Sequence, residues 1–334
     1  MERNAPFPMD RPDGIPATAP RNPRRVLLVG PLGSERRPAN EAAHTFSALA
    51  DALEREPSLD VDRSDVSAED VADRILAPDS RFDAVMLNVS PADLRCAGDA
   101  VRAACRSAQT PLIVRVFGGG LERLEGSAST AECVLLETRA LCEHFEETEH
   151  AGRIRQWPTT RDLPARQQPL PSRARRFVVV DRSGEQDGIR DAIEAAGRLP
   201  ADAKLTVVKA ESEDDVRRLL AEHDVLVFPA CEAGAGMPGT VVEAMQTGLP
   251  VVATRWRAIP ELVEDGENGL LAAPHNVDGL AAAMRRIAES DDLFRRLQAG
   301  AQRTGERFRA RHWRPRLVRW IHDLASGKPS SATC

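Results

Sequence analysis

Short apolar runs alternate with amphipathic stretches from Val26 to Ala288, and this alternation is the main structural signal in the chain. The runs have the length and the Val/Ile/Leu content of buried parallel strands; they occupy 26–29, 83–89, 111–117, 204–208, 225–228 and 251–253. The intervening stretches, such as 214–222, have helical periodicity. Strands that alternate with helices predict an α/β fold with parallel sheets.

The stretch from Val225 to Leu271 is the most informative part of the chain. Its two apolar runs predict parallel strands, with a helix over 239–247 between them. Glycines just before this helix allow a ligand to approach the backbone, and the N–H groups of Thr240 and Val241 can hold an anion such as a diphosphate. Glu243 is expected in the first turn, where its carboxylate can accept hydrogen bonds from sugar hydroxyls. The alternative is that the glycines only form a turn and Glu243 complements the helix dipole.

This stretch resembles family 4 glycosyltransferases, retaining enzymes of the GT-B fold, and especially those that build bacterial polysaccharides. The positions in register are Glu243 to Met245, Gly248 to Thr254, Ile259 to Glu261 and Glu264 to Leu271. The resemblance implies an α/β chain of two Rossmann-like domains whose parallel sheets face each other across a cleft. It also implies a nucleotide-diphosphate sugar as donor substrate, no cofactor and no metal.

The resemblance assigns the donor site and exposes two departures from the family pattern. Ala235 stands where the family has the first Glu of its donor motif, and Asp187 stands where its phosphate motif has a Lys. Glu232 is the candidate to replace the missing catalytic carboxylate. The expected donor-binding residues are Arg182, Gly236, Met237, Pro238, Gly239, Thr240, Val241 and Glu243.

The first apolar run leads into a glycine-containing loop, which is typical of the start of a Rossmann-like domain. Relatives usually carry a Gly-Gly pair before the next helix, whereas this chain has Ala39-Asn40. On the acceptor side, the resemblance points to Gly33, Arg115, Gly118 and Gly119.

Composition and the resemblance together give the expected domain organisation. The parts are a disordered Pro-rich leader at 1–23, an N-terminal Rossmann-like acceptor domain at 24–158, a linker at 159–176, a C-terminal Rossmann-like nucleotide-sugar-binding domain at 177–305, a helix at 306–326 and a disordered tail at 327–334. The helix is amphipathic and basic. Two roles are open for it: packing back on the N-terminal domain, or peripheral contact with an anionic membrane.

Charge and cysteine content narrow the functional classes. The net charge of −6 argues against a general nucleic-acid binder. The six cysteines form no CxxC pair and none has zinc-like spacing to a histidine, so no metal site and a reduced, cytoplasmic compartment are expected. A membrane-bound tail would place the protein at the inner face of the membrane.

Two functions follow. The first is a retaining, hexosyltransferase-type enzyme that moves a sugar from a nucleotide-diphosphate donor to a carbohydrate or lipid-linked acceptor hydroxyl without a metal. The second is a catalytically degenerate GT-B protein that acts as the protein partner of an active enzyme, because Ala235 and Asp187 both alter the donor site.

Overall fold

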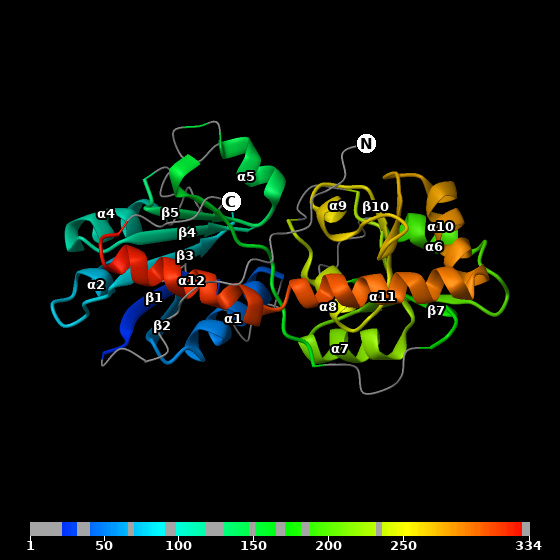
Figure 1. Ribbon diagram of the computed structural model, residues 1–334, viewed down its shortest axis with the longest axis horizontal. Coiled ribbons are helices and arrows are strands. Elements are labelled where there is room, and N and C mark those ends of the chain that lie inside the picture. The colour runs from blue at the N-terminus through cyan, green and yellow to red at the C-terminus, as the bar shows by residue number, and fades with distance from the viewer. Residues whose placement is uncertain are drawn as a thin grey trace. The chain divides into compact units, whose positions relative to one another are not determined.

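The computed structural model (Figure 1) shows a chain of two compact units, each built on its own parallel sheet. One unit comprises 159–309, and the other comprises the described residues before 159 together with 310–328. The structure describes residues 22–31, 41–65, 70–90, 98–117, 130–146, 148, 151–164, 171–181, 188–231 and 236–328.

The N-terminal unit holds a six-stranded sheet with the order β2-β1-β3-β4-β5-β6. All neighbouring strands in it are parallel. Its central strands are buried along their whole length, as expected for a parallel sheet that is covered on both faces. The strands are β1 (Arg24–Gly30), β2 (Leu59–Asp65), β3 (Ala84–Val89), β4 (Leu112–Val116), β5 (Cys133–Leu136) and β6 (Ile154–Gln156).

Helices cover both faces of this sheet. One core cluster joins alternate residues of β1, β3, β4 and β5 to three helices, α2 (Val71–Leu76), α4 (Gly98–Ala108) and α5 (Arg139–Glu146). This cluster contains no residue of α1 (Glu41–Glu54) or α12 (Ala310–Ala325). Because α12 packs against α1 and β3, these two helices lie on the opposite face.

The C-terminal unit holds a five-stranded sheet, again parallel throughout, with the order β11-β10-β9-β7-β8. The strands are β7 (Arg176–Asp181), β8 (Lys204–Lys209), β9 (Val225–Phe228), β10 (Val251–Thr254) and β11 (Gly269–Ala272). The helices are α6 (Ile189–Ala196), α7 (Glu213–Glu222), α8 (Gly239–Gln246), α9 (Ile259–Leu262), α10 (Val277–Glu289) and α11 (Asp291–Arg307). Two core clusters, one on each face, bury this sheet: α7, α8 and α9 contribute to one, and α6 and α10 to the other.

The C-terminal helix differs from the prediction in its bounds. The chain leaves helical geometry at Phe308, so the stretch expected as one helix over 306–326 is the end of α11 followed by α12. Phe308 is buried in the core of the C-terminal unit, which accounts for the break.

The apolar face of α12 is buried within the N-terminal unit. Trp313 and Trp320 are 5% and 6% exposed and lie edge-to-face against Trp157, with ring centroids 6.1 and 6.4 Å away. Leu317 and Ile321 are fully buried. These side chains therefore pack in the core and do not form an apolar surface for a bilayer. Among the described helices, none is long and apolar enough to span one.

Candidate functional site

The carboxyl edge of the C-terminal sheet carries the strand, helix and strand that the sequence predicts. β9 and β10 pair in parallel, and α8 connects them. All eight residues of α8 are buried, because α11 packs across it. The contact is so close that a Cβ added at Gly305 would lie 2.4 Å from the backbone nitrogen of Gln246. Ligands of open parallel sheets bind beyond the carboxyl ends of the strands, which is where α8 begins.

The start of α8 offers backbone rather than side chains to a ligand. Pro238 is the N-cap and provides no side-chain hydrogen bond to the helix. Met237, Thr240 and Val241 are 3%, 4% and 0% exposed, so their side chains belong to the core. The first N–H groups of an α-helix have no acceptor within the helix, and they favour an anion. This end of α8 therefore has the properties of a phosphate-binding turn.

Glu243 lies deeper in the structure than the sequence suggested. It is the fifth residue of α8, beyond the first turn, and is only 3% exposed. Its Oε1 accepts a hydrogen bond from Nε of Arg161 at 3.0 Å, and both side chains are about 95% buried. The carboxylate is thus held by a specific cation, and the alternative of a simple helix-dipole partner does not describe it.

Arg161 is the site residue that sequence reasoning missed. It is 4% exposed, and its backbone N–H donates to the carbonyl of Phe308. Its own carbonyl accepts a hydrogen bond from Nε2 of Gln246, on the same helix as Glu243. Arg161 lies in the stretch 159–176 that the sequence predicts as a linker. That prediction gave no indication that the arginine would reach α8.

Gly188, the residue after Asp187 of the candidate phosphate motif, is required by close packing. It is the N-cap of α6 and has φ of 65°, which L side chains rarely adopt. A Cβ at this position would lie 1.8 Å from the carbonyl oxygen of Pro229, just after β9. Gly188 therefore lets α6 begin directly against the end of β9, at the edge where α8 also begins.

Asn268 lies in the stretch 264–271 that resembles the family pattern, and its hydrogen bonds show what it does there. Its Oδ1 accepts the N–H of Glu264, while its Nδ2 donates to the carbonyl of Leu262 and to the hydroxyl of Thr304. The side chain is 3% exposed. Asn268 thus fixes the turn that leads into β11, which is a structural role.

Several predicted site residues fall outside the described residues, so the geometry reported above does not include them. They are Glu232, Ala235, Arg182, Asp187, Gly33, Ala39, Asn40, Gly118 and Gly119.

Arg115, the remaining acceptor-side candidate, lies inside the N-terminal unit and is 1% exposed. Its Nη1 donates to Oδ1 of Asn88 at 2.7 Å, and its Nη2 pairs with Oε1 of Glu137 at 3.0 Å. The three residues lie at the carboxyl ends of β3, β4 and β5. A contact between Arg115 and an acceptor would require this buried network to open.

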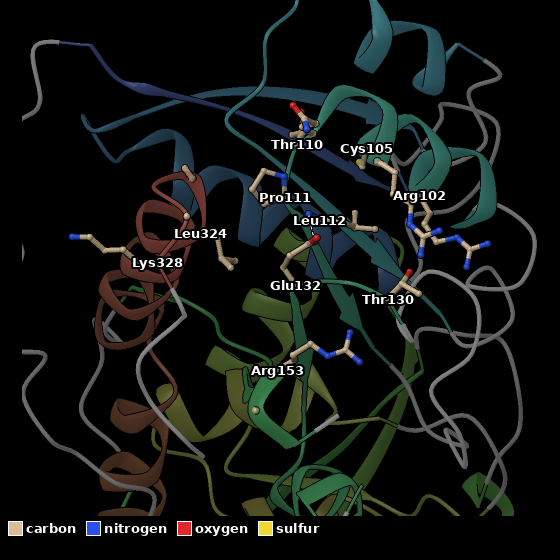
Figure 2. Close-up of a pocket in the computed structure, with 15 residues that line it drawn as sticks. Arg102, Cys105, Thr110, Pro111, Leu112, Thr130, Glu132, Arg153, Leu324 and Lys328 are labelled. Carbon is tan, nitrogen blue, oxygen red and sulfur yellow. Dashed lines mark hydrogen bonds between the residues drawn. The ribbon is translucent and has the colours of Figure 1, made fainter. Parts of the chain in front are cut away.

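A cavity of about 910 Å³ lies at the opposite edge of the N-terminal sheet, between the ends of α4 and α12 and the amino ends of β4, β5 and β6 (Figure 2). Arg153 and Glu132 extend into it, whereas Lys328 points away. Glu132 accepts the N–H of Leu112 at 2.8 Å. Because active sites of such sheets lie at the carboxyl edge, this cavity is not the expected donor or acceptor site.

Cys105 lines this cavity, and its thiol is buried. Burial, together with a smaller effect of the negative charge of Glu132, raises the pKa of the Cys105 thiol to about 12. A thiol with so high a pKa stays protonated near neutral pH and is a poor nucleophile. Cys105 is therefore a structural residue.

Comparisons with known proteins find sequence similarity in the C-terminal part of the chain. Residues 161–290 match the family described as Glycosyl transferases group 1, and the match begins at Arg161. The MMP alpha-(1->4)-mannosyltransferase of Mycolicibacterium hassiacum is 39% identical over 93 residues, which is 28% of this chain and 22% of that protein. The amylovoran biosynthesis glycosyltransferase AmsK of Erwinia amylovora is 30% identical over 148 residues, 35% of this chain and 36% of that protein. The matched segments thus span about a quarter to a third of these relatives.

Solved structures show the fold over nearly the whole chain. HepE from Anabaena in complex with UDP has a TM-score of 0.67 at 16% identity, and the similarity covers 91% of this chain and 100% of that one. Sucrose-phosphate synthase from Thermosynechococcus elongatus has the same TM-score and coverage at 14% identity. The two parallel α/β units are therefore those of the GT-B glycosyltransferase fold, as the sequence predicted.

Proposed function

We propose that this chain is a glycosyltransferase of the group 1 type that transfers a sugar from a nucleotide-diphosphate donor to an acceptor hydroxyl. The observation that carries the proposal is the start of α8, which presents backbone at the carboxyl edge of the sheet four residues before the buried pair of Glu243 and Arg161. The match over 161–290 includes all of these groups.

The diphosphate and the ribose of the donor would each have partners in the proposed site. The diphosphate would lie at the first turn of α8, where the helix dipole and the N–H groups favour negative charge. Arg182 would add a cation to the leaving diphosphate. Glu243 would accept hydrogen bonds from the ribose hydroxyls, which requires its buried side chain to become accessible, and Arg161 would orient its carboxylate. The UDP in the complex of HepE supports this class of donor.

The proposal also includes retention of configuration at the transferred sugar and independence from a metal ion. In retaining transfer, the acceptor oxygen attacks the face of the sugar from which the diphosphate leaves. The charge that develops on the diphosphate would be met by the start of α8 and by Arg182, so the reaction would need no divalent ion. Glu232 would act beside the sugar, where the family has the residue that Ala235 replaces. A carbohydrate or lipid-linked hydroxyl would be the acceptor, bound near Gly33, Gly118 and Gly119.

Titration calorimetry with UDP, GDP and their common sugar conjugates tests the donor site. Glu243→Gln is the informative variant, because it keeps the shape and an oxygen acceptor for Arg161 but removes the charge. Glu289→Gln, an exposed substitution on α10 of the same unit, is the matched control. We expect one donor to bind and Glu243→Gln to weaken it by about tenfold or more, equivalent to about 1.4 kcal/mol. Binding that Glu243→Gln leaves unchanged would contradict the ribose role.

The second candidate is a degenerate GT-B protein that serves as the partner of an active enzyme, and Ala235 and Asp187 are the observations that favour it. Failure of every nucleotide and conjugate to bind would support this function and refute the transferase. The variant Ala235→Glu separates the two at the level of catalysis. If the missing carboxylate limits an active enzyme, this variant raises the rate of donor hydrolysis or transfer, whereas in a protein without a donor site it changes neither.

A further inference from the structure

Three side chains with metal-ligating atoms meet at the carboxyl edge of the C-terminal sheet: Asp191, Cys231 and His275. A carboxylate oxygen, the sulfur and an imidazole nitrogen all lie within 4.8 Å of one another. Asp191 is partly buried, Cys231 is 7% exposed and His275 is exposed. Cys231 is not part of a disulfide. Spacing along the chain predicts no metal site here, because the three residues lie far apart in the sequence.

The fold accounts for their convergence. α6 and α10 pack side by side on one face of the sheet, and both begin at its carboxyl edge. Asp191 lies in the first turn of α6, and His275 directly precedes Asn276, the N-cap of α10. Cys231 lies just beyond the end of β9, where the hydroxyl of Thr254 donates to the carbonyl of the preceding residue.

We propose that Asp191, Cys231 and His275 form a binding site for a zinc-type divalent cation. Thiolate, imidazole and carboxylate are the three ligand types that Zn²⁺ takes, and the thiolate and carboxylate charges balance the charge of the ion. Tetrahedral zinc with ligand distances of about 2.0–2.3 Å places its ligand atoms about 3.3–3.8 Å apart, so an adjustment of about 1 Å closes the site. The exposed side chain of His275 allows this movement. Water would supply the fourth ligand.

The mutual closeness of the three atoms distinguishes this site from a nucleophilic triad. In a triad, the carboxylate binds the imidazole nitrogen that points away from the nucleophile, so the carboxylate and the nucleophile are far apart. Here the carboxylate oxygen and the sulfur also lie within 4.8 Å of each other. A metal ion bound between the three atoms fits that geometry, whereas a nucleophilic triad does not.

The bound ion would have a structural role. It would tie the end of β9 to the beginnings of α6 and α10, and Cys231 directly precedes Glu232 in the sequence. Zinc would therefore stabilise the C-terminal unit and restrain one end of the proposed donor loop. This inference does not depend on transferase activity, because the ion is detected directly.

The test uses the full chain, treated with chelator under reducing conditions and then titrated with Zn²⁺ against a chromogenic competitor. We expect one ion per chain with a dissociation constant on the order of 1 μM or tighter. His275→Gln should weaken binding by at least about tenfold, while His144→Gln, at an exposed histidine of α5, should not. Cobalt provides the spectroscopic readout, because a thiolate-to-cobalt charge-transfer band should appear in the wild type and vanish in Cys231→Ala.

Two results would overturn the proposal. One is the absence of stoichiometric binding to the wild type. The other is zinc binding that His275→Gln and Asp191→Asn both leave unchanged, which would place the ion elsewhere. His275 is exposed, so its variant should fold even if Cys231→Ala does not. Loss of zinc binding with UDP or GDP binding intact would separate this site from the donor site.

Discussion

The buried ion pair between Arg161 and Glu243 should make the C-terminal unit sensitive to the loss of either partner, and a double-mutant cycle can measure the coupling between them. Both side chains are about 95% buried, and the charged atoms are 3.0 Å apart. At an effective dielectric constant of about 20, the attraction between unit charges at this distance is about 5.5 kcal/mol. Much of it offsets the cost of removing both charges from water. The net value of the pair is therefore small, whereas the loss of either partner alone is costly.

The variants are Arg161→Met, Glu243→Met and the double substitution, which replace each charged group with an unbranched apolar side chain. Each single variant should lower the free energy of unfolding by about 3–5 kcal/mol, because it leaves the other charge buried without its partner. The double variant should lie within about 2 kcal/mol of the wild type, since it contains neither charge. Native-state hydrogen exchange at the amides of α8 is the measurement, because it reports on the C-terminal unit alone.

The result that would refute this reasoning is additivity. If the double variant loses the sum of the two single losses to within about 0.5 kcal/mol, the two side chains do not interact energetically. The two single variants should also weaken nucleotide binding. If Arg161→Met left nucleotide affinity unchanged while Glu243→Met abolished it, Arg161 would have no part in orienting the carboxylate.

Three further predictions concern other parts of the chain. Cys105, whose pKa is raised to about 12, should resist alkylation at pH 8 in the folded protein and react on unfolding, as peptide mass mapping can show. Burial and the charge of Arg24 lower the pKa of His322 below 6.5, so the unfolded state binds the proton at a higher pH than the folded state does. The stability of the protein should therefore fall as the pH drops below about 6.5, and it should fall less in His322→Gln. Thermal denaturation across that pH range measures both. Gly188→Ala should cost at least about 2 kcal/mol in urea unfolding, whereas Gly266→Ala, which also has positive φ but open space around it, should cost about 1 kcal/mol.

The C-terminal sheet was predictable where local signals agree. β9 and β10 are short apolar runs bounded by proline, and α8 begins after a glycine and proline cluster, so periodicity and turn residues give the same answer. β2 was not predicted, because it is an edge strand whose sequence LDVDRSD buries only part of one face and is mostly charged. β6 has only three residues, which is too short for a period.

The candidate site was predictable only in part, because its key contacts are tertiary. The turn before α8 follows from local sequence. The pairing of Glu243 with Arg161, by contrast, depends on how the chain that leaves Pro158 packs against α8, and no pattern of spacing encodes it. The same holds for the meeting of Asp191 with Cys231 and His275, which arises from the order of strands in the sheet.

The matched family residues divide by physical role, and this division bears on activity. Gly188 and Asn268 hold elements together, as does Gly305 outside the matched run, and α8 is buried on all sides. Any chain with this fold needs such residues, whether or not it turns over a donor. The two departures, Ala235 and Asp187, fall at positions that the resemblance assigns to contact with the donor. We therefore expect activity to depend on the positions where this chain differs, and a measurement on the donor itself tests activity more directly than the extent of the match does.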